Sequence, residues 1–149
     1  MSLVLPLRRL EPAAAPPPPP VRRTLHLDGT PLLESWAAKV RDAAEAMVLA
    51  DASGRLVALS PHAGKLLALD PAAAVGAMLL DLVEVVDFTS AAVPVPDPDV
   101  QLPLLRAIVT GRLNRGLVRL RTAQGLCSYD VVGIPLSDAA GAVGFLATI

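Results

Sequence analysis

Two proline-led helix starts lie in the middle of this sequence, and strand-like segments lie on both sides of them. Ser60-Pro61 and Asp70-Pro71 each place a capping side chain directly before a proline. Proline suits the first helical position because no intrahelical partner is needed there for a backbone N–H. Short helices are therefore predicted over residues 61–69 and 72–75, with strands before and well after them.

The segment before these helices has the pattern of a β-hairpin. Two apolar runs, residues 46–50 and 55–59, flank Asp51-Ala52-Ser53-Gly54, and Gly54 supplies the positive φ that such a turn needs. Gly76 breaks the chain after the second short helix, and residues 78–83 are expected to be a short helical or extended piece.

The rest of the chain reads as one helix followed by three strands. Pro94, Pro96 and Pro98 make residues 88–99 irregular, and a longer helix is predicted over 103–112. The strands are predicted at residues 117–121, 126–135 and 143–149. Strands separated from helices in this way predict an α+β fold with a five-stranded antiparallel sheet.

The N-terminal third differs in composition. Residues 1–23 contain five consecutive prolines, 16–20, and are interpreted as a disordered Pro/Ala-rich spacer. Docking of this stretch on an aromatic-lined groove of a partner is the alternative. Residues 24–45 form an N-terminal cap segment whose amphipathic helix, from Thr30 to about Glu45, carries Leu33, Trp36 and Val40 on one stripe.

Composition excludes several classes of protein. Hydrophobic residues make up 53% of the 149 and aromatic residues only 3%, so an aliphatic core is expected. A net charge of −1 gives no basic stripe for nucleic acid, and no apolar run is long enough to cross a membrane. The single cysteine, Cys127, excludes an internal disulfide framework. We therefore expect a cytoplasmic protein.

Residues 43–149 resemble the PAS family of sensory and protein-interaction domains. Asp51–Val57 is similar to its "D-x-x-G-x-I-V" turn, Val75–Leu82 to its "x-G-x-x-L-x-D-L" segment, and Ile134–Gly141 to its "P-L-x-D-x-x-G" turn. Thr110-Gly111 and Thr122–Gly125 also match its pattern. Profilin-like and GAF-like domains are the fold alternatives.

The resemblance implies a cavity between the sheet and the longer helix. Its lining would come from Met78, Leu82, Phe88, Leu105 and Val109. All are apolar, so the space holds either an apolar ligand or, as we expect, filled core.

The cofactor motifs of the family are missing. Cys127 lies on a predicted strand instead of in the flavin-adduct motif of the photosensory members, and residues 103–112 contain no haem-ligating histidine. No cofactor is therefore predicted.

No group of residues in the sequence has the spacing expected of a catalytic or metal-binding site. Ser60 and His62 are too close in sequence to act as nucleophile and base with Asp51, and a metal site of His26 with His62 is equally unsupported. An acidic group is better explained as a solvated loop than as an ion site: Glu84, Asp87, Asp97 and Asp99. Cys127 is interpreted as a buried strand residue and not as a redox switch.

These observations predict a signalling module that is not an enzyme. It would sense a small molecule or mediate regulated homodimerisation through the helix with Leu33, Trp36 and Val40 and through its sheet. A ligand-free adaptor that binds another protein is the alternative. Neither nucleic acid nor a membrane is an expected partner, and a sensory fragment of a longer protein is compatible with the sequence.

Overall fold

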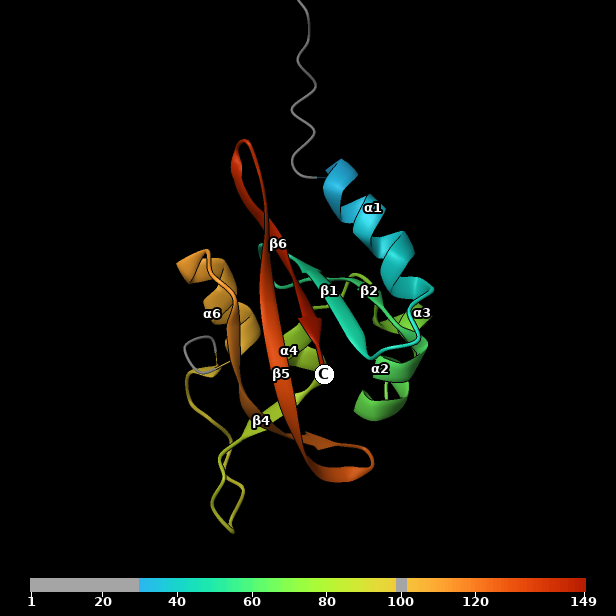
Figure 1. Ribbon diagram of the computed structural model, residues 1–149. Helices are drawn as coiled ribbons and strands as arrows, with labels where there is room; N and C mark the ends of the chain where they lie inside the picture. Colours follow the sequence, from blue (N-terminus) through green and yellow to red (C-terminus); the bar gives the residue numbers. More distant parts are fainter. Residues whose placement is uncertain (1–29, 99–101) are drawn as a thin grey trace, which may run out of the picture.

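A computed structural model describes residues 30–98 and 102–149. Six antiparallel strands form one sheet in the order β2-β1-β6-β5-β4-β3, with the helices around it (Figure 1). The elements, in chain order, are α1 (Thr30–Arg41), β1 (Met47–Asp51), β2 (Leu56–Leu59), α2 (Pro61–Leu67), α3 (Pro71–Ala74), α4 (Leu79–Leu82), β3 (Glu84–Val86), α6 (Pro103–Thr110), β4 (Asn114–Thr122), β5 (Gly125–Asp138) and β6 (Gly141–Thr148).

The predicted capping chemistry is confirmed at both proline-led helix starts. The Ser60 hydroxyl accepts a hydrogen bond from the Ala63 N–H at the start of α2. The Asp70 carboxylate accepts one from the Ala72 N–H in α3. The β1–β2 hairpin also forms as predicted, with Gly54 at φ 88°. Local side-chain chemistry therefore sets the order of strands and helices in this part of the chain.

The sheet has one strand more than predicted. β3 is only three residues long and pairs with β4, where Val85 lies opposite Leu120. Val85 and Val86 are adjacent and both buried, although Glu84 before them is exposed, so the segment does not keep the alternation of polar and apolar residues that marks a strand exposed on one side. The predicted sheet of five strands was wrong in lacking β3.

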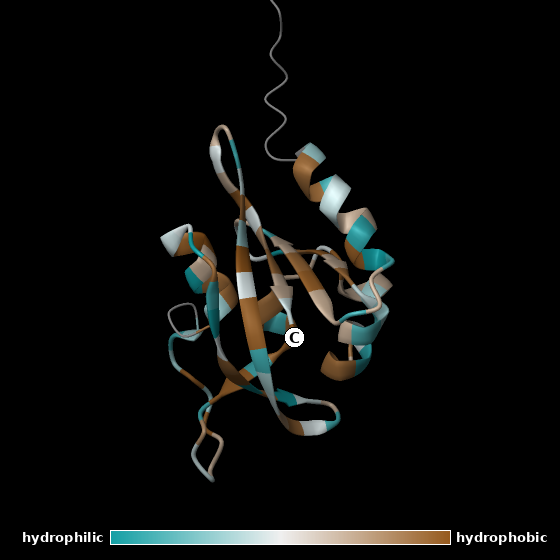
Figure 2. Cartoon of the chain, viewed as in Figure 1, coloured by the Kyte–Doolittle hydropathy of each residue, from teal (hydrophilic) through white to brown (hydrophobic). Residues whose placement is uncertain are grey.

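Two hydrophobic clusters cover the two faces of the sheet. On the inner face, α2, α4 and α6 pack against a cluster centred on Phe145, Leu56 and Val118. On the outer face, α1 packs over β1, β2 and β6 and forms a second cluster with Leu49 and Leu146. In Figure 2 the strands between these helices carry brown, white and teal bands, with brown on β1 and on the middle of β5.

The apolar stripe of α1 packs against the sheet of its own chain. Val40 is fully buried, and Leu33 and Trp36 are half-buried against the outer cluster. The prediction that this stripe forms a dimer seam is wrong for Val40. Its side chain packs instead on the apolar outer face of β1 and β6, which lies next to α1 in the same chain. The helix also ends at Arg41 and not near Glu45, because the chain turns there to enter β1.

The start of α6 lies directly on β5. A Cβ atom at Gly133 would come within 2.6 Å of the Leu104 Cα and of the Pro103 carbonyl oxygen. Only glycine fits at this point of β5, since no real Cβ atom approaches backbone atoms so closely. This backbone contact sets the height of α6 above the sheet.

Candidate functional site

A small apolar cavity of about 40 Å³ lies between the sheet and the helices. A single water molecule takes ~30 Å³ of liquid volume, whereas ligand pockets usually measure ~300–1,000 Å³. The lining comes from every layer of the inner face: Val48, Leu67, Leu79, Val83, Leu102, Leu104, Val118, Leu120, Tyr129, Val131, Ala147 and Ile149.

None of the five predicted lining residues borders this cavity. Phe88 is 59% exposed and Val109 is 85% exposed, so the prediction was wrong for these two. The periodicity of α6 does not reveal which of its faces meets the sheet, and that face is formed by Leu104 and Ala107. Met78, Leu82 and Leu105 are partly buried at the periphery of the inner core.

Tyr129 is the one polar side chain at the cavity, and sequence reasoning missed it. Its hydroxyl donates a 2.7 Å hydrogen bond to the Leu66 carbonyl in α2. Burial raises the pKa of Tyr129 to about 12, and the hydrogen bond with the Cys127 side chain acts in the same direction. The tyrosine thereby ties β5 to α2.

Cys127 is half-buried on β5, opposite Leu120 of β4. Arg119 and Arg121 flank Leu120 in sequence, so their side chains point to the other face of the sheet. The electropositive surroundings that would activate this thiol are therefore not provided by these two arginines.

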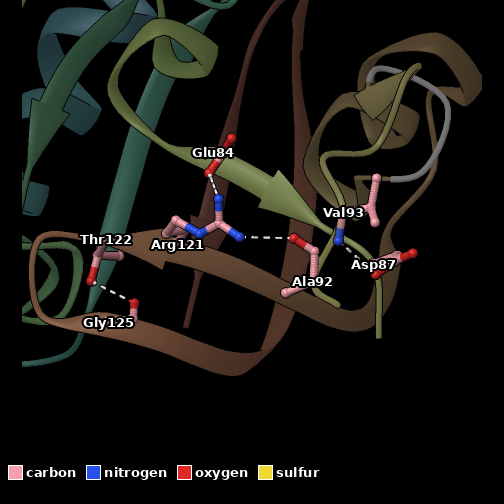
Figure 3. A network of polar contacts seen from close by, with 7 residues as sticks. All are labelled: Glu84, Asp87, Ala92, Val93, Arg121, Thr122 and Gly125. Carbon is pink, nitrogen blue, oxygen red and sulfur yellow. Dashed lines mark hydrogen bonds and ion pairs between the residues drawn. The ribbon is translucent and has the colours of Figure 1, made fainter. Parts of the chain in front are cut away.

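A polar network closes the β3 edge of the sheet (Figure 3). The Arg121 guanidinium donates to the Glu84 carboxylate at 2.9 Å and to the Ala92 carbonyl at 2.8 Å. The Arg119 guanidinium donates to the Thr89 carbonyl at 2.8 Å. Two outward-facing arginines of β4 thus hold the loop that follows β3.

The same loop is fixed from within by Asp87. Its carboxylate accepts hydrogen bonds from the Thr89 hydroxyl at 2.6 Å and from the Val93 N–H at 3.0 Å. The Thr89 hydroxyl bond is the largest of the influences that hold the pKa of Asp87 below its usual value. The backbone then seals the edge, since the Val95 N–H donates to the Val85 carbonyl at 2.9 Å.

The arrangement of strands and helices resembles that of several solved structures. A PAS domain of a Colwellia psychrerythraea protein superposes with a TM-score of 0.56 at 16% identity, over 78% of this chain and 93% of that chain. The PAS domain of a nitrogen regulation protein from Vibrio parahaemolyticus gives 0.52 at 13% identity, over 76% and 94%. The fold is PAS-like.

An RNA-binding light-oxygen-voltage receptor gives a TM-score of 0.56 at 20% identity and matches 88% of this chain. The match spans 36% of that receptor. No protein-family model matches the sequence. No curated protein matches it either. These similarities therefore establish the fold of the PAS-like domain.

The polar residues singled out as site candidates have structural roles in the PAS-like domain. Ser60 is fully buried, and its hydroxyl donates to the Glu45 carbonyl, while His62 is exposed at the start of α2. Asp51 holds the hairpin turn through the Ser53 and Arg55 N–H groups. The three side chains that resembled a catalytic triad are therefore not arranged as one.

The acidic group is not brought together as a set. Glu84 and Asp87 belong to the network at the β3 edge, and Asp97 is exposed. Asp99 and His26 lie outside the described residues. Within residues 30–98 and 102–149, no three His, Cys, Asp or Glu side chains gather closely enough to hold a metal ion. In the same part of the chain, no helix is long and apolar enough to span a membrane.

The outer face of β4 and β5 exposes apolar side chains that α1 does not cover. Leu117 is 66% exposed, and it lines a shallow pocket of about 130 Å³ together with Phe88. Leu126 is also exposed, and an Arg115–Asp130 ion pair lies beside Leu117 on the same face. We call Phe88 and Leu117 the outer patch.

Proposed function

We propose that this PAS-like domain is a cytosolic signalling module that acts through regulated homodimerisation and is not an enzyme. The observation that carries the proposal is the contrast between a 40 Å³ interior cavity and an exposed outer patch. A cavity of this size favours a filled core over a pocket for a cofactor-sized ligand. Exposed apolar side chains beside a polar rim are typical of transient protein interfaces.

The outer patch has the composition expected of such an interface. Leu117 and Phe88 supply apolar area, and Arg119 and Asp130 lie next to Leu117 in the sheet. Aromatic and arginine side chains are enriched where interfaces contribute most to affinity. A second copy of this face would bring two apolar patches together between charged margins.

Sedimentation of the full chain tests the proposal. We expect a monomer–dimer equilibrium, and we expect Leu117→Asp to weaken it at least about tenfold, which corresponds to ~1.4 kcal/mol. Val109→Asp is the matched control, because Val109 is exposed on α6 and outside the patch. A strict monomer at high concentration, or equal effects of the two substitutions, would contradict the dimer.

A ligand-free adaptor that binds another protein is the second candidate, favoured by the same small cavity. Native mass spectrometry distinguishes these functions from small-molecule sensing. Additional mass that is seen only under native conditions would identify a ligand and overturn the ligand-free adaptor.

A further inference from the structure

The first half of β4 is an open edge of the sheet in the described chain. β4 pairs with β5 along its whole length, from Asn114 to Thr122. On its other side it pairs with β3 only at residues 119–121, because β3 ends at Val86 (Figure 1). Residues 114–118 therefore have a neighbouring strand on one side only.

The register of the sheet determines which backbone groups face this edge. The Val85 carbonyl accepts a hydrogen bond from the Val95 N–H, so it faces away from β4 and from the opposite residue Leu120. In an antiparallel sheet, alternate residues direct both backbone groups to the same neighbour. Leu120 therefore bonds to β5, whereas Arg115 and Leu117 direct their N–H and carbonyl groups to the β3 side. Within the part of the chain that the structure describes, no hydrogen bond is made to these groups on that side.

Exposed apolar side chains lie along the open edge. Leu113 directly precedes the strand and is 61% exposed, and Leu117 is also exposed. The pocket of about 130 Å³ beside Phe88 and Leu117 lies where β3 stops. An extended segment that continues the sheet at this point would find backbone partners in β4 and an apolar pocket for one of its side chains.

Most of the features that protect a strand edge do not occur in this stretch. Proteins usually protect an edge with proline, a β-bulge, inward-pointing charges or a covering loop. Residues 114–118 contain no proline, and their pairing with β5 continues without a bulge. Their one charged residue, Arg115, forms an ion pair with Asp130. The edge is thus regular enough to accept another strand.

The charges around the edge favour an acidic partner. Residues 102–129 contain arginines and no carboxylate: Arg106, Arg112, Arg115, Arg119 and Arg121. The last three of these already bind Asp130 or the loop after β3. Arg106 and Arg112 are exposed, and neither forms an ion pair within the described ranges 30–98 and 102–149. Carboxylates of a partner would therefore meet cations that the chain itself does not neutralise.

The same charges disfavour a second copy of this edge. Two β4 strands that paired along residues 114–118 would place the arginines of both copies side by side. Like charges that lie opposite each other destabilise a strand pair, and like-charge contacts select against a wrong partner. The occupant that fits the edge is therefore a different protein.

We propose that the open edge of β4 binds an extended segment of another protein, rich in apolar and acidic residues, which adds a strand beside residues 114–118. The segment pairs its backbone with Arg115 and Leu117, places an apolar side chain in the pocket beside Phe88, and directs carboxylates toward Arg112. The proposal goes beyond homodimerisation, because the outer patch is a face of the sheet and this site is its edge. Leu117 takes part in both, through its side chain in the patch and through its backbone at the edge.

Binding of a synthetic peptide to the full chain tests the proposal. The probe is a fluorescently labelled peptide that alternates valine and glutamate, and its counterpart has lysine in place of glutamate. We expect the glutamate peptide to bind at least about tenfold more tightly and to slow hydrogen exchange of the Arg115 and Leu117 amides. Absence of binding, equal affinity of the two peptides, or binding without protection of these two amides would overturn the proposal.

A pair of substitutions at one position separates backbone pairing from charge. Arg115→Ala and Arg115→Pro both remove the guanidinium, but only proline removes the N–H that faces the edge. Proline is tolerated on an edge strand at such a position, and unchanged exchange at Val118 would show that the pairing with β5 is intact. We expect Arg115→Pro to bind the glutamate peptide at least about tenfold more weakly than Arg115→Ala. Equal affinities would contradict strand addition, and the exchange test on the unaltered chain does not depend on either variant.

Sedimentation of the same two variants without peptide distinguishes the edge from the homodimer. We expect Arg115→Pro and Arg115→Ala to have the same monomer–dimer equilibrium, because the edge N–H plays no part in the outer patch. A dimer that only the proline variant dissociates would show that a second copy occupies the edge, and it would overturn the proposal. Loss of peptide binding with an intact dimer would refute the edge site alone, whereas peptide binding by a strict monomer would refute the homodimer alone.

Discussion

The two edges of the sheet end in different ways. At the β3 edge the chain turns back, so that residues 93–95 pair with β3 and two arginines of β4 hold the intervening loop. At the β2 edge the chain passes from Leu59 directly into the Ser60-Pro61 helix start. The capping pair that starts α2 also takes the chain away from the edge. An exposed strand edge is a site for pairing with another segment, and at the β2 edge the Leu56 N–H and carbonyl are paired with Ala77 and Gly76.

The largest expected effect comes from the residue that ends β2. Ser60→Ala removes a fully buried hydroxyl that bonds the Glu45 carbonyl, the Met47 N–H and the Ala63 N–H. We expect the free energy of unfolding to fall by about 2–4 kcal/mol, because three backbone groups lose a partner. Denaturant unfolding measures this. Ser53→Ala, which removes an exposed turn hydroxyl, should change stability by less than about 1 kcal/mol.

The Tyr129 hydroxyl ties β5 to α2 through the Leu66 carbonyl. We expect Tyr129→Phe to lower stability by about 1 kcal/mol through the loss of one partly buried hydrogen bond. Because the pKa is raised to about 12, the tyrosine of the native protein stays protonated up to that pH. The stability that it contributes is complete below its usual value of 10 and is lost as pH rises from there toward 12.

Ultraviolet absorbance of tyrosinate reports this titration directly, because Tyr129 is the single tyrosine of the chain. A midpoint close to 10 in the folded protein would show that burial does not raise the pKa of Tyr129. The phenylalanine variant should lack the pH-dependent part of the stability loss.

The sealed edge should depend on Arg121 but not on every arginine of β4. Arg121→Ala removes the hydrogen bonds to Glu84 and Ala92, and we expect stability to fall by about 0.5–1 kcal/mol. Amide exchange at Val95 should accelerate in parallel. Arg115→Ala breaks an exposed ion pair with Asp130 that does not touch the loop. If it speeds exchange at Val95 equally, the network does not seal the edge.

The smallest effect should be the pH dependence of the loop. Because the pKa of Asp87 is lowered by its hydrogen bond from Thr89, its contribution is present above the usual carboxyl value of 3.8. This contribution is lost as pH falls through the lower folded value. Chemical shifts of the Thr89 and Val93 amides should follow that titration. Asp87→Asn should abolish it, and an unchanged titration would assign the shifts to another group.

The order of elements could be predicted because local chemistry encodes it. Ser60, Asp70 and Gly54 act on residues within a few positions, so their roles are visible in the sequence. β3 was missed because its valines are buried on both faces and show no alternation. The end of α1 was missed because it depends on where β1 begins in space.

The candidate site could not be predicted to the same degree. The contact with Gly133 decides which face of α6 meets the sheet. This contact is long-range, so the periodicity of Leu105 and Val109 within the helix does not reveal it. Tyr129 was overlooked for a similar reason, since its partner Leu66 is 63 residues away. Packing between distant segments sets these positions.

Gly133 also connects the two faces of the sheet at the middle of the domain. Without a side chain between them, α6 and β5 touch backbone to backbone. The next residue, Ile134, faces the opposite side of the sheet and packs into the cluster beneath α1. A displacement of α6 would therefore also displace β5, and through Ile134 it would reach the cluster beneath α1. The helices on the two faces of the sheet are thus connected through β5 at Gly133.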